Sequence, residues 1–223
     1  MSHTVALVPI RALWGGKTRL AATFDEHQRS KLVLALAQQL LEALEASEIA
    51  DEVMILTADP ALVRTLGLPR RRFLREVPPG LNAAVNAGRR EALASGAERL
   101  LVVFPDLPEV GVGDLQAIAL SQAAVTIIPD RQHDGTNALL LQGAGIIRDF
   151  PFTYGPGSCQ AHRDVASSLG EVASVLDVPA MAIDLDTDED WRRLPAATRA
   201  RLRLDIARDW PIPETQPVLM ERS

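Results

Sequence analysis

The sequence VALVPI at residues 5–10 is an uninterrupted apolar run, and the glycine-rich basic sequence WGGKTR follows it at residues 14–19. A strand that is covered on both faces shows such a continuous run instead of alternating polar and apolar residues. Residues 26–46 then place leucines and valine at three- and four-residue spacing, which is typical of a helix. Short apolar runs and helical stretches alternate along the rest of the chain. This rhythm predicts βαβ units and an α/β fold with a mainly parallel, Rossmann-like sheet.

The other expected elements follow the same rhythm. Further strands are predicted at residues 53–56, 71–75, 100–104, 124–128, 137–141 and 181–185. Further helices are predicted at residues 60–66, 81–95, 114–122, 160–169 and 188–194. We find no repeat and no linker, so we expect one domain over residues 1–194 and a C-terminal extension over residues 195–223. This extension starts with an arginine-rich helical stretch, which could pack on its own domain or on a second copy in a homodimer, and it ends in a loose segment from residue 211.

The charge balance of the chain limits its partners. The chain of 223 residues has 23 Lys and Arg against 29 Asp and Glu, for a net charge of −6. Duplex nucleic acid and anionic lipid both need a basic surface, so neither is expected as a partner. A single cysteine, Cys159, excludes an internal disulfide framework and a thiolate-rich metal cluster. No apolar run reaches the roughly 20 residues of a membrane span and we see no signal peptide, so we expect a cytoplasmic protein.

The loop after the first strand could hold phosphate. In open parallel sheets, ligands bind beyond the carboxyl ends of the strands, where this loop lies. The turn at Gly16 would present backbone N–H groups, and the Lys17 and Arg19 cations would contact phosphate oxygens. A P-loop is excluded because its first glycine would fall at Arg11. The alternative is a basic loop that is only solvated.

Acidic residues follow two other predicted strands. Asp106 lies between two prolines after the strand at residues 100–104, and Asp184 and Asp186 lie around the end of the last strand. Residues two apart on an extended chain face the same side, so the pair could share one cation. Carboxylate oxygens suit Mg²⁺, and two close carboxylates without a counter-cation would repel each other. The alternatives are that Asp106 caps a turn, that Asp186 serves the following helix and that Asp184 pairs with an arginine.

Three further loops contain residue types that bind small molecules. Residues 134–137 offer a hydroxyl and an amide, and residues 154–158 precede a helix whose free N–H groups would suit an anion. Asn82 could contact a base edge or cap its helix, and each of these loops could also be a simple turn. Cys159 and His162 share a helix face, but no third orienting group is identifiable. We therefore interpret them as a buried cysteine and a helix-surface histidine rather than a catalytic pair.

Six motifs in this order resemble the guanylyltransferases of deazaflavin coenzyme (F-420) biosynthesis, which act on 2-phospho-L-lactate or phosphoenolpyruvate. The resemblance covers residues 4–194. The motifs are Ile10-Arg11-Ala12 with Lys17-Thr18-Arg19-Leu20, Gly80-Leu81-Asn82, Asp106-Leu107-Pro108, Asp134-Gly135-Thr136-Asn137-Ala138-Leu139, Tyr154-Gly155-Pro156-Gly157-Ser158 and Asp184-Leu185-Asp186-Thr187. The resemblance implies a mixed, mainly parallel three-layer fold like that of nucleotide-diphospho-sugar transferases and molybdenum-cofactor guanylyltransferases.

The resemblance also implies GTP as a substrate, Mg²⁺ as a cofactor and a role for each motif. Pyrophosphate would be released as GMP is transferred to a phosphorylated three-carbon acid. The implied metal ligands are Asp106, Asp184 and Asp186; the implied nucleotide contacts are Gly16, Lys17, Arg19, Leu81 and Asn82; and the implied contacts with the acid are Thr136, Gly155 and Ser158. Of these, Asp106, Lys17 and Arg19 are the expected catalytic residues.

The chain departs from the family pattern at two places. Cys159 stands where family members often have an aromatic residue, and Gly15-Gly16 replaces an alanine-basic pair. Two alternative functions stay open at this point. One is another nucleotidyltransferase of the same fold, with a different nucleotide or a pterin or sugar phosphate acceptor. The other is a non-catalytic nucleotide-binding protein, against which the presence of all three aspartates argues.

Overall fold

In the computed structural model, the described residues are 2–66, 72–74, 79–210 and 212. Their strands are β1 Thr4–Pro9, β2 Glu52–Leu56, β3 Arg72–Leu74, β4 Arg99–Val103, β5 Val125–Pro129, β6 Thr136–Gln142 and β7 Ser174–Val175. Their α-helices are α1 Glu26–Ser47, α2 Pro60–Leu66, α3 Leu81–Ala94, α4 Val112–Ala119, α5 Ala144–Asp149, α6 Ser158–Ser168, α7 Asp188–Arg193 and α8 Ala196–Ala207. Two short 3₁₀-helices are η1 Thr18–Leu20 and η2 Pro179–Met181.

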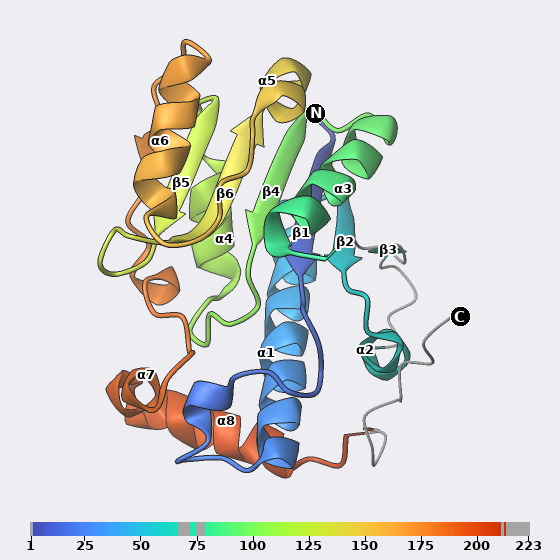
Figure 1. The fold of residues 1–223 in the computed structure, drawn as a ribbon, viewed down its shortest axis with the longest axis vertical. Helices are drawn as coiled ribbons and strands as arrows, with labels where there is room; N and C mark the ends of the chain where they lie inside the picture. Colours follow the sequence, from blue (N-terminus) through green and yellow to red (C-terminus); the bar gives the residue numbers. More distant parts are fainter. Residues whose placement is uncertain (1, 67–71, 75–78, 211, 213–223) are drawn as a thin grey trace.

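The strands form one mixed sheet in the order β3-β2-β1-β4-β6-β5-β7, with helices on both faces (Figure 1). β1 pairs in parallel with β2 and β4, β2 with β3, and β5 with β7. β6 alone among the described strands runs antiparallel to its neighbours, β4 and β5. The mixed, mainly parallel sheet confirms the predicted α/β fold, and it brings the start of β6 to the edge where β4 ends.

The residues of β1 divide the core into two layers. Ala6 and Val8 pack in a cluster that includes residues of α1, α2 and α4. Val5 and Leu7 pack in the opposite cluster with residues of α3, α5 and α6. Successive side chains of a strand point to opposite faces, so a strand between two helical layers needs apolar residues at every position. The continuous apolar run at residues 5–10 is explained by this double coverage.

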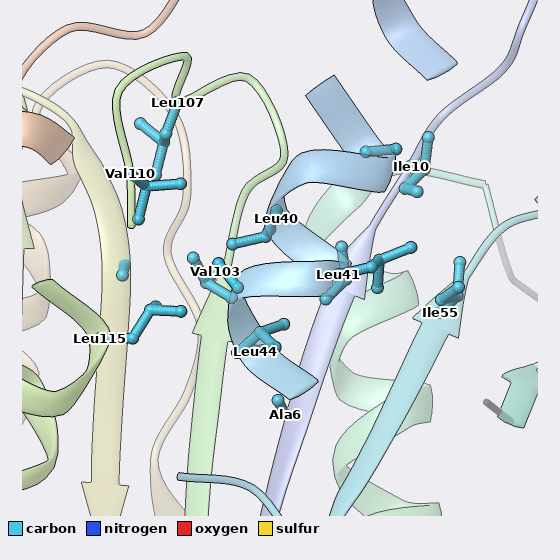
Figure 2. Close-up of a cluster of buried hydrophobic side chains, with 14 of the residues drawn as sticks. Ala6, Ile10, Leu40, Leu41, Leu44, Ile55, Val103, Leu107, Val110 and Leu115 are labelled. Atoms are coloured by element: carbon cyan, nitrogen blue, oxygen red, sulfur yellow. The ribbon is translucent and has the colours of Figure 1, made fainter. Parts of the chain in front are cut away.

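Helix α1 fixes one of these layers. Asp25 and Gln28 form a capping box at its start, in which each side chain accepts a hydrogen bond from the other residue's backbone N–H. Figure 2 shows Leu40, Leu41 and Leu44 of α1 beside the strands of the sheet, in the cluster that also contains Ala6, Ile55 and Val103. These three leucines are at most 1% exposed. Burial of each such side chain contributes about 1.5–3 kcal/mol, so α1 is anchored mainly by this face.

A third apolar cluster lies at the end of the sheet toward which β1 and β4 point. It joins Leu20 and Phe24, near η1, to Leu185, Trp191 of α7 and Leu202 of α8. The Phe24 and Trp191 rings meet edge to face with centroids 4.8 Å apart. Figure 1 shows α7 and α8 beyond that end of the sheet. The arginine-rich helix α8 therefore packs on its own domain, which was one of the two predicted alternatives.

Several predicted boundaries differ from the structure. The prediction of a strand at residues 181–185 is wrong: Pro179 begins η2, and the following segment is hydrogen-bonded through Ala182 O and Leu185 N to the loops after β5 and β4. The edge position beside β5 is taken instead by β7, and α5 was not expected.

Of the strand predicted at residues 71–75, residues 72–74 are described and extended. The segment predicted to be loose from residue 211 lies almost entirely outside the described residues. No described helix is both long and apolar enough for a membrane span.

Gly88 of α3 sits where the helix comes closest to the sheet. A Cβ atom at this position would lie 2.8 Å from Leu56 Cδ2 and 3.1 Å from Leu7 Cδ1, and both leucines are buried. We therefore expect Gly88→Ala to lower the free energy of unfolding by roughly 1–3 kcal/mol, measured by denaturant titration. Gly113 of α4 is the matched control, because nothing lies within 4 Å of an added Cβ there. Gly113→Ala should be neutral or stabilising by up to about 1 kcal/mol, and equal effects of the two changes would contradict the close packing of α3.

Candidate active site

Three loops meet beyond the carboxyl ends of β1 and β4. Lys17 lies in the loop after β1, Asp106 in the loop after β4, and Asp184 and Asp186 in the segment that leads to α7. The Leu185 N–H donates a hydrogen bond of 2.8 Å to Asp106 O, which joins the last two loops through their backbones. The sequence-predicted aspartates are thus brought to one place, although they are far apart in the chain.

The Lys17 ammonium connects all three loops. Its Nζ donates to Leu185 O at 2.6 Å and to Asp186 Oδ1 at 3.0 Å, and it lies 3.5 Å from Asp106 Oδ2. Lys17 has a left-handed backbone conformation, with φ of 49°, immediately before η1. Burial lowers the pKa of Lys17, but the negative charges of Asp106 and Asp186 outweigh burial and raise it above its usual value. The lysine is therefore a buried cation at neutral pH.

The surroundings of Asp184 disfavour its charged form. Burial, followed by the nearby charge of Asp106, raises the pKa of Asp184 to about 6, and Asp186 and Asp190 add to the shift. The carboxylates of Asp106 and Asp186 flank the Lys17 ammonium, and Asp184 and Asp190 add further negative charge nearby, which leaves a local excess of negative charge. This donor set has the oxygen chemistry that Mg²⁺ prefers. Within the described parts of the chain, no three His, Cys, Asp or Glu side chains are arranged as a metal site, so the predicted Mg²⁺ ligands stay a prediction.

The rest of the glycine-rich loop faces solvent. Gly15 has a φ of 72°, a conformation that L side chains rarely adopt, and a Cβ atom added at Gly16 would lie 3.7 Å from Ala12 O. Arg19 is exposed within η1, whereas the side chain of Lys17 is only 11% exposed. We call Asp106, Asp184 and Asp186 the acidic cluster. The structure therefore separates the two predicted cations: Lys17 contacts the acidic cluster, and Arg19 is accessible to a ligand.

The three residues predicted to contact an acid lie together. Thr136 begins β6 and Ser158 begins α6, and the Ser158 hydroxyl lies 3.3 Å from Thr136 Oγ1. Gly155 O accepts a hydrogen bond of 3.1 Å from Ser158 N. Because β6 is antiparallel to β4, Thr136 lies at the same edge of the sheet as Asp106. We call the Thr136 and Ser158 side chains, together with the adjoining Gly155 backbone, the hydroxyl cluster.

The amide groups at the start of α6 are not free, which corrects the sequence-based expectation. The Gly157 N–H donates to Asp134 Oδ2 at 3.1 Å, and the Cys159 N–H donates to Asp134 O at 2.9 Å. Asp134 therefore already places a carboxylate at this helix N-terminus, where the helix dipole favours negative charge. An anion bound near Ser158 would depend on side-chain hydroxyls more than on these backbone groups.

Asn82 of α3 uses both ends of its amide to hold another loop. Its Nδ2 donates to Tyr154 O at 3.0 Å, and its Oδ1 accepts from Tyr154 N at 2.8 Å. It does not cap α3, whose N-cap residue is Gly80. Leu81, next to it, is 39% exposed. The predicted contact of these two residues with guanine stays a prediction, and Leu81 is the more accessible of the two.

His162 was interpreted as a helix-surface residue, and that interpretation is wrong. The side chain is fully buried in α6, between the rings of Phe150 and Tyr154. Cys159 is buried as expected, and burial raises the pKa of its thiol, which disfavours the nucleophilic thiolate. The sequence did contain one signal for the position of His162. It lies four residues after Ser158, and this spacing places the two residues on one helix face.

Helices α1 and α8 support the loop that carries Asp106. Gln39 of α1 donates from Nε2 to Pro108 O at 3.1 Å and to Val110 O at 3.0 Å. Arg201 of α8 donates to the same Pro108 O at 2.5 Å and to Gln39 Oε1 at 2.7 Å. The backbone two residues after Asp106 is therefore held by two helices at once.

The raised pKa of Asp184 predicts a pH-dependent gain in stability when it is replaced. The folded-state pKa of about 6 exceeds the ordinary value of 3.8, so folding favours the protonated form. The contribution of the Asp184 carboxyl group to the free energy of unfolding is complete below pH 3.8 and is lost as the pH rises through 6. In a chelator-containing buffer, Asp184→Asn should raise the unfolding free energy by ~1 kcal/mol at pH 8, since solvent screens part of the effect.

Denaturant titrations of the wild type and Asp184→Asn at pH 4 and pH 8 test this expectation. The difference between the two proteins should be smaller at pH 4 than at pH 8. The exposed Asp149, at the end of α5, is the matched control, and Asp149→Asn should give no such pH-dependent gain. A stability difference for Asp184→Asn that is the same at both pH values would contradict the assigned charge environment.

Comparison with known proteins gives a family for this geometry. The chain matches the family described as guanylyl transferase CofC like over residues 4–195. A phosphoenolpyruvate guanylyltransferase of Rubrobacter xylanophilus is 37% identical over 201 residues, which cover 89% of this chain and 96% of that protein. A 3-phospho-D-glycerate guanylyltransferase of Phenylobacterium zucineum is 32% identical over 192 residues, covering 83% of this chain and 86% of that protein.

Solved structures agree with the fold. A nucleotidyl transferase from Methanothermobacter superposes with a TM-score of 0.63 at 19% identity, covering 91% of this chain and 98% of that chain. A 4-diphosphocytidyl-2C-methyl-D-erythritol synthase also gives a TM-score of 0.63, at 16% identity, covering 92% of this chain and all of that chain. These similarities show a nucleotide-diphospho-sugar-transferase type of α/β fold. With the family match over residues 4–195 and more than 30% identity to its named relatives, this chain belongs to the CofC-like guanylyl transferase family.

Proposed function

We propose that this chain transfers GMP from GTP to phosphoenolpyruvate, or to the related acid 2-phospho-L-lactate, and releases pyrophosphate in the biosynthesis of coenzyme F-420. The observation that carries the proposal is the acidic cluster around Lys17, in a chain that matches this family over nearly the whole domain. Relatives named for phosphoenolpyruvate and for 3-phospho-D-glycerate support a phosphorylated three-carbon acid as the acceptor.

The reaction needs positioning more than acid–base catalysis. A phosphate oxygen of the acid attacks the α-phosphorus of GTP, a new P–O–P bond forms, and the bond from the α-phosphorus to the bridging oxygen of the β-phosphate breaks. The electron pair of that bond leaves with pyrophosphate. The attacking oxygen is already anionic near neutral pH, so no general base is required. The protein must align the two substrates and offset their negative charge.

The residues of the acidic cluster divide this work by their charge. The excess of carboxylates over cations and their oxygen chemistry fit a divalent cation, and Asp106, Asp184 and Asp186 would hold Mg²⁺. When bound, Mg²⁺ supplies charge neutralisation at the phosphates. Lys17 keeps its ammonium charged beside Asp106 and Asp186, and the accessible Arg19 can contact phosphate oxygens. Thr136 offers its hydroxyl to the acid at the same edge of the sheet, with the Ser158 hydroxyl 3.3 Å from Thr136 Oγ1.

The direct test is a product assay with a panel of substrates. The protein is incubated with GTP, Mg²⁺ and, in separate reactions, phosphoenolpyruvate, 2-phospho-L-lactate or 3-phosphoglycerate, and the products are identified by mass. We expect pyrophosphate and a guanylylated acid, with phosphoenolpyruvate as the best acceptor. Faster turnover with CTP or ATP would indicate another nucleotidyltransferase of this fold. Nucleotide binding without pyrophosphate release from any pair would indicate a non-catalytic protein.

Asp106→Asn tests the acidic cluster within this reaction. Removing the negative charge should lower kcat by about 100-fold or more while the protein remains folded, because charge neutralisation at the phosphates contributes most of the rate. The measurement is pyrophosphate release at saturating GTP and acid, with far-UV circular dichroism as the check on folding. Asp149→Asn changes the charge equally at an exposed position on α5 and should keep the wild-type rate. A wild-type rate for Asp106→Asn would refute its assignment to the metal.

A further inference from the structure

His162 is a buried imidazole beside the hydroxyl cluster and has no role in the reaction described above. It is 0% exposed and lies against the edges and faces of aromatic rings, with the Tyr154 ring centroid at 4.8 Å and that of Phe150 at 5.8 Å. Burial lowers the pKa of His162 to about 4. The ring is therefore neutral at neutral pH, with one nitrogen that carries a hydrogen and one that accepts a hydrogen bond.

The backbone decides which nitrogen carries the hydrogen. The Thr153 N–H donates to His162 Nε2 at 3.2 Å, and a backbone N–H can only donate. Nε2 is therefore the acceptor, and the hydrogen of the neutral ring is on Nδ1. Nδ1 lies 3.0 Å from Thr136 Oγ1, so in this tautomer His162 donates to the Thr136 hydroxyl. The Thr153 N–H thus fixes the tautomer of His162 and, through it, the direction of the hydrogen bond to Thr136.

This direction matters because a hydroxyl has one hydrogen to donate. With His162 as donor, the lone pairs of Thr136 Oγ1 receive the hydrogen from Nδ1, and the Ser158 hydroxyl, 3.3 Å away, can donate to the same oxygen. The Thr136 hydrogen is then directed away from the histidine. In the other tautomer the Thr136 hydroxyl would donate its hydrogen to Nδ1, and that hydrogen would not be available to a ligand. Thr136 is 5% exposed, so water has little access to correct a misdirected hydroxyl.

We infer that His162 is a positioning residue of the acid subsite: it fixes the Thr136 hydroxyl as a hydrogen-bond donor to the anionic groups of the phosphorylated acid. This inference rests on the proposed function, because it takes the hydroxyl cluster as the place where the acid binds. His162 itself does not contact the acid. The ligand it prepares for is one that accepts hydrogen bonds, such as a phosphate or carboxylate oxygen.

Two substitutions separate the two hydrogen bonds of His162. In His162→Asn the amide nitrogen can take the place of Nδ1 and donate to Thr136, while the acceptor for Thr153 is lost. In His162→Gln the longer side chain can place its amide oxygen near Nε2 and accept from Thr153, while the donor to Thr136 is lost. Both variants remove the ring and one hydrogen bond, so each serves as the control for the other.

The readout is steady-state kinetics with GTP and phosphoenolpyruvate. The KM for phosphoenolpyruvate should rise about tenfold or more in His162→Gln and by less than about threefold in His162→Asn, whereas the KM for GTP should stay the same in both. In a Thr136→Val background, where the hydroxyl is absent, His162→Gln should have no further effect on the KM for the acid. Thermal unfolding of each variant records its loss of stability.

Other results would overturn the inference. Equal rises in the KM for phosphoenolpyruvate in the Asn and Gln variants, or equal rises for both substrates, would indicate a structural role only. Additive effects of His162→Gln and Thr136→Val would do the same. The tautomer is tested without activity by ¹⁵N NMR of the wild-type protein with labelled histidine. A hydrogen on Nε2 would overturn the inference even in an active enzyme, whereas absent turnover with every acid would refute the proposed function and leave the tautomer to be judged by NMR.

Discussion

The ammonium group of Lys17 is the interaction on which the arrangement of the site depends. It donates to Leu185 O and Asp186 and lies 3.5 Å from Asp106, so one side chain contacts two loops that lie far from it in the sequence. A buried cation of this kind is stable only with opposite charges beside it, and the raised pKa of Lys17 reflects that pairing. The carboxylates in turn need a cation, since Asp184 already has a raised pKa. Mutual charge compensation therefore keeps the three loops together.

The sheet determines where this charged cluster and the hydroxyl cluster lie relative to each other. β4 ends shortly before Asp106, and its antiparallel neighbour β6 begins at Thr136, so both residues lie at one edge. Asn137 strengthens the connection, because its Nδ2 donates to Met181 O at 2.7 Å, just before the segment with Asp184 and Asp186. A single reversal of strand direction thus brings groups suited to a nucleotide and groups suited to an acid to the same edge.

The sequence predicted those features that depend on local patterns. The apolar run at residues 5–10 and the leucine spacing of α1 reflect burial on known faces, so the α/β fold was correctly predicted. The apolar residues 181–185 misled the prediction, because Leu185 is buried under α7 and α8 and not within the sheet. The partners of Lys17, Asn82 and His162 could not be predicted, because each contact depends on the packing of distant loops. The family motifs predicted residues that the structure brings close together, but not their hydrogen-bond partners.

Helix α8 begins after residue 195, where the family match ends, and yet Arg201 holds Pro108 O within two residues of Asp106. A segment outside the family match thereby supports the loop that carries Asp106. Chimeras that exchange C-terminal extensions between family members would carry over this support or lose it. The minimal unit that preserves the site in this chain therefore extends through α8, beyond the limits that family resemblance alone would set.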